Sequence, residues 1–175
     1  QRSTSVLSCV DSECGAAFLG AAAIAEGTRV PVVIEVDTGM GRAGVLPGDA
    51  TVDLAKRVDQ IDGVELVGLM TWEAAAAKEA DIDAKRAAAT RMLTGLTESA
   101  DACRAAGLNM EIVTCGGTLT YWFSAFHPGV TEMQAGGGIY GDAMYCHKYG
   151  VDHEFALTIK STVTSRPTPR RIICD

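Results

Sequence analysis

Short apolar runs, rich in β-branched residues, alternate along the chain with longer segments whose apolar residues recur at helical spacing. The short runs predict strands over residues 30–36, 64–70, 110–114 and 130–134, and the end of another strand at residues 5–8. The longer segments predict helices over residues 11–25, from about 49 to 61, 79–106 and 118–126. Strands that alternate with helices favour parallel pairing, in either a doubly wound sheet or a barrel.

Two of these helices carry start and stop signals. Pro47 and Gly48 break the chain, after which Asp49 or Thr51 is expected to cap the second helix. The Ala-rich third helix is expected to end at Gly107 and to place these residues on one face: Met92, Leu93, Leu96, Ala100 and Cys103.

The pattern changes near the end of the chain. Residues 154–166 alternate between apolar and polar side chains, Pro167 and Pro169 indicate a turn, and residues 171–174 predict a further strand. This is the pattern of an antiparallel sheet. The chain is therefore expected to divide into residues 1–152, an α/β part, and residues 153–175, the start of a β domain.

Composition and charge exclude several classes of function. The 175 residues are 47% hydrophobic and carry a net charge of −7, with no run of basic residues. Nucleic acid is therefore not an expected partner, because nothing offers a row of positive charge to phosphates. No apolar stretch reaches the roughly 18 residues of a membrane span, so a soluble protein is expected.

Six cysteines are scattered through apolar or Gly-rich surroundings, at positions 9, 14, 103, 115, 146 and 174. A chain of this size does not need disulfides for its core, so reduced and mostly buried thiols in a cytoplasmic protein are expected. The group formed by Cys146, His147 and His153 matches no usual metal-ligand spacing, and no metal site is expected within this chain. Cys115 is interpreted as a packed thiol in preference to a nucleophile.

Four unusual segments each begin where a predicted strand ends, at residues 37–44, 71–73, 115–118 and 134–138. In parallel α/β folds a ligand lies across the carboxyl ends of the strands, so these segments are expected to converge on one site. Glycine clusters at strand ends can expose N–H groups to a phosphate, although each is also an ordinary turn sequence. Arg42 can offer a fork of donors to an anionic oxygen, or else remain solvated or pair with Asp37.

The run VVIEVDTGMGRAG resembles the alanine-racemase type of pyridoxal 5'-phosphate (PLP) barrel, which has fold type III. The segments TCGGTLTY and GVTEMQAGGGIYGD are similar to the branch that contains D-threonine aldolase and D-serine dehydratase. The resemblance implies an α/β fold: about the last five βα units of a TIM-type (β/α)8 barrel, running into a C-terminal antiparallel β domain. A complete barrel of this type needs about 250 residues.

The resemblance also implies roles for individual residues. Arg42 is expected at the phenolic oxygen of the cofactor, and Gln134 at its pyridine nitrogen. Trp72 is a catalytic candidate together with Arg42, since its ring can stack near the cofactor, although a packing role is an equal alternative. The phosphate is expected to lie against Gly116, Gly117 and Thr118, with Gly136 and Gly137 closing the cup.

The implied activity is a lyase reaction on D-3-hydroxy amino acids, either retro-aldol cleavage of D-threonine-like substrates or dehydration of D-serine-like substrates. The family also implies a homodimer and a divalent metal (Mn, Mg or Zn), held by residues outside this chain. Two alternatives remain: an amino-acid racemase, which Gln134 weighs against, and a non-catalytic PLP-binding or scaffolding protein.

The Schiff-base lysine of the family is expected at the end of the first barrel strand, upstream of Arg42. No lysine of this chain ends such a strand; they stand at positions 56, 78, 85, 148 and 160. The chain by itself is therefore expected to be inactive.

Overall fold

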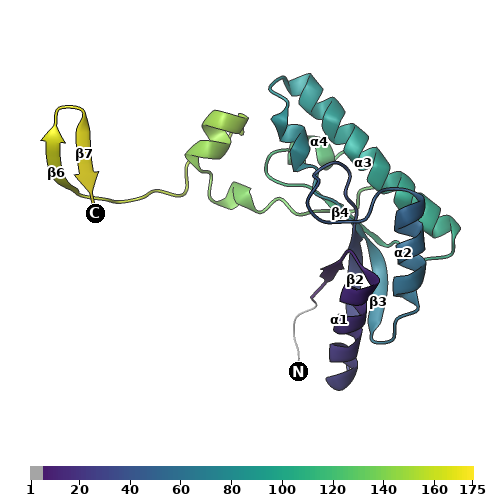
Figure 1. Ribbon diagram of the computed structural model, residues 1–175. Helices are drawn as coiled ribbons and strands as arrows, with labels where there is room; N and C mark the ends of the chain where they lie inside the picture. The colour runs from purple at the N-terminus through teal and green to yellow at the C-terminus, as the bar shows by residue number, and fades with distance from the viewer. Residues whose placement is uncertain (1–5) are drawn as a thin grey trace. The chain divides into compact units, whose positions relative to one another are not determined.

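The computed structural model describes residues 6–175, which form two compact units divided between Gly136 and Gly137. The first unit contains a five-stranded parallel sheet, and the second contains short helical turns and a hairpin (Figure 1). The domain boundary that the sequence indicates at about His153 stays a prediction.

The five strands of the first unit follow the chain in spatial order: β1 (Ser8–Val10), β2 (Val30–Glu35), β3 (Val64–Met70), β4 (Ile112–Cys115) and β5 (Glu132–Met133). Each strand pairs in parallel with the next. Parallel strands in sequential order, with a helical connection between each of the first four, are the arrangement of a barrel wall. The predicted partial barrel with five strands is therefore confirmed.

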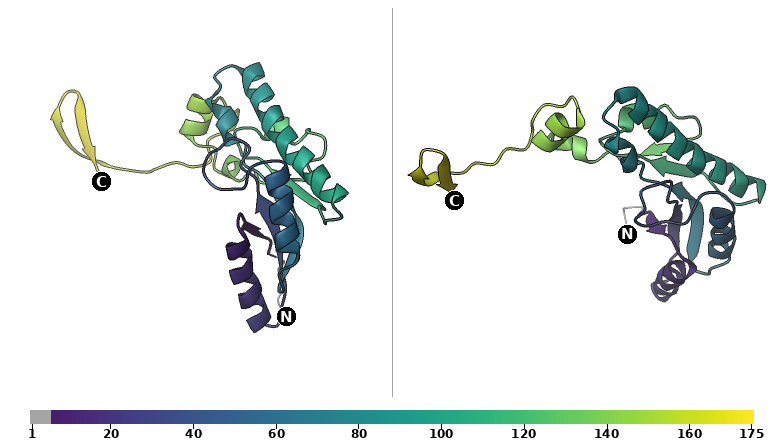
Figure 2. Two further views of the ribbon diagram at one scale, coloured as in Figure 1. Left: turned by 45° about the vertical axis from the view of Figure 1, so that its right-hand side comes forward. Right: turned by 45° about the horizontal axis from the view of Figure 1, so that its top comes forward.

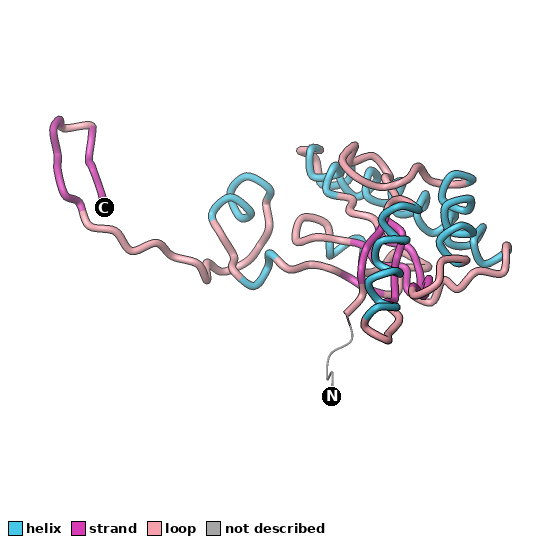
Figure 3. The backbone as a smooth tube through the Cα atoms, turned by 60° about the horizontal axis from the view of Figure 1, so that its bottom comes forward, coloured by secondary structure: helices cyan, strands magenta, loops and turns pink. Residues whose placement is uncertain are grey.

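Three long helices form the outer layer of this unit: α1 (Glu13–Ala25), α2 (Asp49–Asp59) and α3 (Ile82–Ala105). Figure 2 shows α2 and α3 side by side along the sheet, and in Figure 3 the helices flank the grouped strands. Their apolar faces and the strands share one hydrophobic core, to which α3 contributes Leu93, Leu96, Ala100 and Cys103. Met92, expected on the same face, is partly buried in a smaller separate cluster.

Two predicted helix starts need correction. The N-cap of α2 is Gly48, whose N–H donates to the Ser99 hydroxyl of α3 at 2.9 Å, while the Thr51 hydroxyl donates to the Leu46 carbonyl at 2.8 Å. Neither Asp49 nor Thr51 is therefore the cap. The third helix begins at Ile82, because the Asp81 side chain caps it and residues 74–78 form a separate 3-10 helix, η1 (Ala74–Lys78). The short helix after β4 is only α4 (Tyr121–Ser124).

The second unit contains the 3-10 turn η2 (Gly137–Ile139), the π-helical turn η3 (Met144–Lys148) and an antiparallel hairpin of β6 (Val163–Thr168) and β7 (Arg171–Cys174). The antiparallel pairing was predicted, but the first strand is shorter than expected, since residues 154–162 form no strand. Pro167 lies within β6 and not in the turn, which a two-stranded hairpin tolerates because each of its strands is an edge.

The cysteines are less buried than expected. All six are free thiols, but only Cys103 and Cys115 are buried, while Cys9, Cys14 and Cys174 are exposed. Among residues 6–175, no helix is long and apolar enough to cross a membrane.

Candidate functional site

The segment that follows β2, residues 37–45, is tied together by its own backbone and is called the β2 loop below. The Asp37 carboxylate accepts hydrogen bonds from the N–H groups of Gly39 and Gly41, each at 3.0 Å. These bonds, the one from Gly41 first, lower the pKa of Asp37. At the base of the loop, the Val45 carbonyl accepts from the Asp37 N–H at 2.9 Å, and the Val45 N–H donates to the Glu35 carbonyl at 2.9 Å. The β2 loop is therefore a closed ring.

Arg42 projects from this ring and is held on two sides. Its guanidinium lies 3.6 Å from the Glu35 carboxylate and 5.0 Å from the centre of the Trp72 ring. The partner of Arg42 is therefore Glu35, and Asp37, the partner considered from the sequence, instead binds glycine N–H groups. Because its side chain is still 55% exposed, Arg42 keeps donors free for a ligand.

Trp72 follows β3 and contacts both of the neighbouring strand ends. The preceding residue, Thr71, fixes the backbone here: its hydroxyl donates to the Val36 carbonyl at 2.7 Å, and its N–H donates to the Thr114 carbonyl at 3.1 Å. One part of the indole lies against Arg42, and its Nε1 edge lies so near Gly117 that a Cβ there would be 2.7 Å from Nε1. Trp72 therefore lies between two residues that were predicted to bind the cofactor, Arg42 and Gly117.

The turn after β4, residues 116–120, presents unused hydrogen-bonding groups and is called the β4 turn below. Among the described residues, the N–H groups of Gly117 and Thr118 donate to no protein acceptor. The Thr118 hydroxyl is buried and also lacks a partner within the described part of the chain. A buried polar atom without a partner is uncommon and calls for an explanation, of which a bound ligand is one.

Gly116 has a different role in this structure from its neighbours. Its N–H donates to the Glu73 carboxylate at 2.9 Å, so it is already used by the protein. The same carboxylate accepts from the Thr120 hydroxyl at 2.7 Å and from the Ser124 hydroxyl. Glu73 itself is fully buried. The β4 turn is therefore held from β3, the adjacent strand.

The remaining predicted residues lie further along the chain. Gln134 follows β5, and its Nε2 donates to the Thr114 hydroxyl of β4 at 3.0 Å, so it belongs to the same set of strand ends. Gly136 is exposed, and a Cβ built on it would meet nothing within 4 Å. Gly137 begins the second unit. The structure thus brings together Arg42 and Trp72 with the β4 turn, and the roles of Gly136 and Gly137 stay predictions.

Cys115 stands directly before the β4 turn and is a packed thiol, as predicted. It is fully buried, and burial first, with the nearby Glu73 carboxylate second, raises the pKa of the thiol to about 12. A thiol with such a pKa is not a nucleophile near neutral pH. In the second unit the Cys146 thiol donates to the His153 carbonyl at 3.2 Å, and residues 6–175 contain no group of three or more metal-ligating side chains.

Two anchors of this site, Glu35 and Glu73, were not predicted from the sequence. Glu35 gave no signal, because it reads as one more residue of a β strand. Glu73 was recognised at a strand end without a role, because its partners lie 43–51 residues away in the sequence. A local signal did exist for Asp37, since Asp side chains commonly accept from N–H groups a few residues on.

Comparisons with known proteins show the family of this chain. The family model described as the alanine racemase N-terminal domain matches residues 4–144. The 3-hydroxy-D-aspartate aldolase of Paracoccus denitrificans (strain Pd 1222) is 29% identical over 175 residues, which cover 95% of this chain and 45% of that protein. The D-threo-3-hydroxyaspartate dehydratase of Delftia sp. (strain HT23) is 33% identical over 157 residues, covering 88% and 41%.

Among solved structures, the D-threonine aldolase from Filomicrobium marinum superposes with a TM-score of 0.76 at 26% identity, covering 94% of this chain and 45% of that one. The chain thus spans a little under half the length of these relatives. The predicted resemblance to the D-threonine aldolase branch of the fold-type III PLP enzymes is confirmed. The chain belongs to the alanine racemase N-terminal domain family.

Proposed function

We propose that this chain is the cofactor-binding part of a PLP-dependent lyase that acts on D-3-hydroxy amino acids. The names of the relatives, two aldolases and a dehydratase for such substrates, support the reaction class. The observation that carries the proposal is the position of Trp72 between the Arg42 guanidinium and the β4 turn, which gathers a cation and free N–H groups at neighbouring strand ends.

The residues present fit the phosphate of PLP. The partnerless Thr118 hydroxyl and the free N–H groups of Gly117 and Thr118 are donors of the kind that bind phosphate without a side-chain charge. A Cβ at Gly117 would lie 2.7 Å from the Trp72 Nε1, so glycine allows the indole to approach the backbone of the turn closely. We assign the phosphate to this turn, which Gly116 anchors through its N–H. Gly136 and Gly137 are kept as further phosphate ligands on the family resemblance alone.

The other residues act on the ring and on the substrate. When bound, PLP supplies an electron sink for the negative charge that develops at the substrate Cα. Arg42 donates to the phenolic oxygen and is kept in place by Glu35 and Trp72. Trp72 covers one side of the site and excludes water there. Gln134, at the pyridine nitrogen, is neutral and therefore does not stabilise a proton on that nitrogen as a carboxylate would.

Several finer features belong to the same proposal. A divalent metal (Mn, Mg or Zn) is held by residues outside this chain, and the enzyme is a cytoplasmic homodimer. The chain alone is inactive, because among residues 6–175 no lysine lies in a strand. Four lysines lie in helical elements and the fifth in none: Lys56 in α2, Lys78 in η1, Lys85 in α3, Lys148 in η3, and Lys160 between elements. The substrates have a β-hydroxyl group, as in D-threonine, D-serine or 3-hydroxy-D-aspartate.

The test is an assay of a full-length protein that carries this chain, loaded with PLP and Mn²⁺. Glycine released from D-threonine or 3-hydroxy-D-aspartate supports an aldolase, and a 2-oxo acid with ammonia supports a dehydratase. Arg42→Leu should lower kcat at least about 100-fold, as loss of one charge-stabilising donor typically does. Interconversion of D- and L-alanine without lyase activity would show a racemase instead. A colourless and inactive loaded protein would contradict the proposal and favour a non-catalytic one.

A further inference from the structure

We propose that Glu73 is a positioning residue, which holds the β4 turn so that the Gly117 and Thr118 donors face the cofactor phosphate. This inference rests on the proposed function. Glu73 does not face the proposed ligand itself: it is fully buried behind the turn, with no exposed surface. Its effect on a bound phosphate must therefore pass through the turn.

The carboxylate of Glu73 binds the turn at its first and last residues, and also binds Ser124 of α4 beyond it. Oε2 accepts from the Gly116 N–H at 2.9 Å, and Oε1 accepts from the hydroxyls of Thr120, at 2.7 Å, and Ser124. The free donors of Gly117 and Thr118 lie between these fixed points. A short segment anchored at both ends has few ways to reorient its N–H groups.

Glu73 is itself held rigidly. Its carbonyl accepts from the Ala76 N–H at 3.0 Å and so begins η1, while the Thr71 N–H two residues earlier donates to the Thr114 carbonyl of β4. Its neighbour Trp72 contacts Arg42 and Gly117. Two consecutive residues therefore serve the site: Trp72 lines it and Glu73 supports it from behind.

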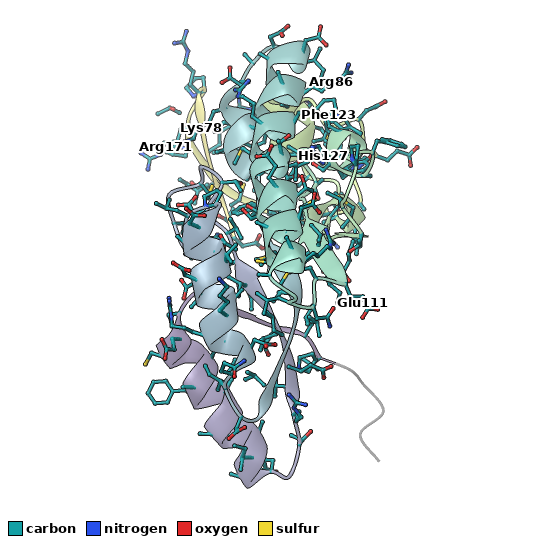
Figure 4. All side chains as sticks on the ribbon, turned by 90° about the vertical axis from the view of Figure 1, so that its right-hand side faces the viewer. Lys78, Arg86, Glu111, Phe123, His127 and Arg171 are labelled. Atoms are coloured by element: carbon teal, nitrogen blue, oxygen red, sulfur yellow. The ribbon has the colours of Figure 1, made fainter. Side chains whose placement is uncertain are left out.

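A second contact helps to keep α4 in place without touching the turn. The Arg86 guanidinium of α3 lies 5.2 Å from the centre of the Phe123 ring of α4, and the two side chains are labelled close to one another in Figure 4. Loss of Glu73 should therefore release the turn more than it releases α4. Loss of Glu73 is therefore expected to weaken phosphate binding without unfolding α4.

Two substitutions of Glu73 can distinguish the effect of its hydrogen bonds from the effect of its negative charge. A backbone N–H can only donate, whereas the Thr120 and Ser124 hydroxyls can donate or accept. In Glu73→Gln the amide oxygen can accept from Gly116, while the amide NH₂ donates to the two hydroxyls, so all three bonds survive. In Glu73→Leu none survives. The first variant removes only the charge, and the second removes the anchor.

The experiment measures binding of pyridoxine 5'-phosphate and of pyridoxine, by NMR titration, to a full-length protein that carries this chain and is prepared without PLP. Neither probe has the aldehyde that would react with lysines, and they differ by the phosphate. In Glu73→Leu, preference for the phosphorylated probe should fall at least about tenfold, which corresponds to the loss of one or two charge-assisted hydrogen bonds. Affinity for pyridoxine should stay within about twofold, because the ring contacts are unchanged.

Two further variants guard against misfolding. Glu73→Gln should keep the wild-type preference within about threefold, because its hydrogen bonds survive. Thr120→Val, which removes one hydroxyl donor at constant volume, should lower the preference by an intermediate factor, and exchange of the Gly116 N–H with deuterium should accelerate in Glu73→Leu but not in Glu73→Gln.

The outcomes distinguish this inference from the function on which it rests. If the wild-type protein prefers the phosphorylated probe and Glu73→Leu keeps that preference, only the role of Glu73 is overturned. The same holds if Glu73→Leu weakens both probes equally, or if Glu73→Gln loses as much preference as Glu73→Leu. If the wild-type protein shows no preference, the proposed phosphate site is wrong and the inference falls with it.

Discussion

The β2 loop and the β4 turn both present groups to the candidate site, but they differ in where most of their anchoring bonds come from. Most bonds of the β2 loop are local: Asp37 binds Gly39 and Gly41, and Val45 bonds Asp37 and Glu35 at the base of the loop. Outside contacts to the β2 loop come from Thr71, which bonds the Thr38 hydroxyl, and from Asp11, which accepts from the Gly44 N–H. The β4 turn is held by Glu73, which belongs to the neighbouring strand end. The bonds that hold a loop can be recognised in the sequence when both partners lie within the loop. When the partner is remote in the sequence, those bonds can be recognised only in the folded structure.

The largest effect is expected where the β2 loop closes on itself. Gly44 has φ 108°, and a Cβ there would lie 2.6 Å from the Asp37 nitrogen, so Gly44→Ala cannot keep the ring. We expect it to lower the free energy of unfolding by about 3 kcal/mol, which combines backbone strain with a lost loop closure. Urea denaturation measures this.

Gly41→Ala is the matched control within the same loop. Gly41 also has a positive φ, of 67°, but a Cβ there would meet nothing within 4 Å. Only the cost of the left-handed backbone remains, about 1 kcal/mol. Equal losses in the two variants would show that the ring is not a structural unit.

The β4 turn should be sensitive in binding more than in stability. Gly117→Ala would place a methyl group 2.7 Å from the Trp72 Nε1, and the indole must then move. We expect affinity for pyridoxine 5'-phosphate to fall about tenfold, or about 1.4 kcal/mol. Gly95→Ala adds a methyl to α3 with ordinary contacts near 3.7 Å and should leave the affinity unchanged. Equal affinities in the two variants would show that the β4 turn does not bind the phosphate.

A smaller effect is expected from Glu35→Gln, which tests whether Glu35 positions Arg42. Glu35→Gln removes the charge 3.6 Å from the guanidinium and should weaken pyridoxine 5'-phosphate binding by about threefold, since a partly exposed ion pair contributes little but orients its members. Glu13→Gln breaks a comparable exposed pair with Arg57 of α2, at 3.1 Å, that does not include Arg42. If both variants bind alike, Glu35 does not position Arg42.

The smallest expected effect is a loss of stability at low pH, through protonation of Asp37. Hydrogen bonds from Gly41 and Gly39 hold the pKa of Asp37 below its usual value of 3.8. The stabilisation is therefore complete above that value and is lost as pH falls through the lower pKa of the folded state. Between pH 5 and pH 2 the wild-type chain should lose more stability than Asp37→Asn, whose amide oxygen still accepts one bond. Parallel curves in urea denaturation would contradict this.

The sequence was sufficient for the parts of the fold that depend on local patterns. The apolar run at residues 64–70 became β3 at the predicted bounds, and the positive φ of Gly107 ends α3 where expected. It was insufficient where long-range contacts decide. The cap of α2 depends on Ser99 in another helix, and alternation alone suggested a strand at residues 154–162 that does not form.

The same division applies to the site. Arg42 and Gly117 were predicted from a glycine-rich context and a resemblance, and the structure brings both against Trp72. Glu35 was not predicted as an anchor, because a partly buried glutamate at the end of a strand does not indicate its pairing with Arg42 of the next loop. Glu73 was not predicted either, because its buried carboxylate binds donors that only folding brings near. Gly116, predicted as a phosphate ligand, uses its N–H for Glu73 in this structure.

The most direct test of a single site at these strand ends is an NMR titration with pyridoxine 5'-phosphate of a full-length protein that carries this chain and is prepared without PLP. The account predicts that the amide signals of Gly117 and Thr118, the indole N–H of Trp72 and the guanidinium signal of Arg42 shift together, with one dissociation constant. Shifts limited to one loop, or separate dissociation constants for the two loops, would contradict it.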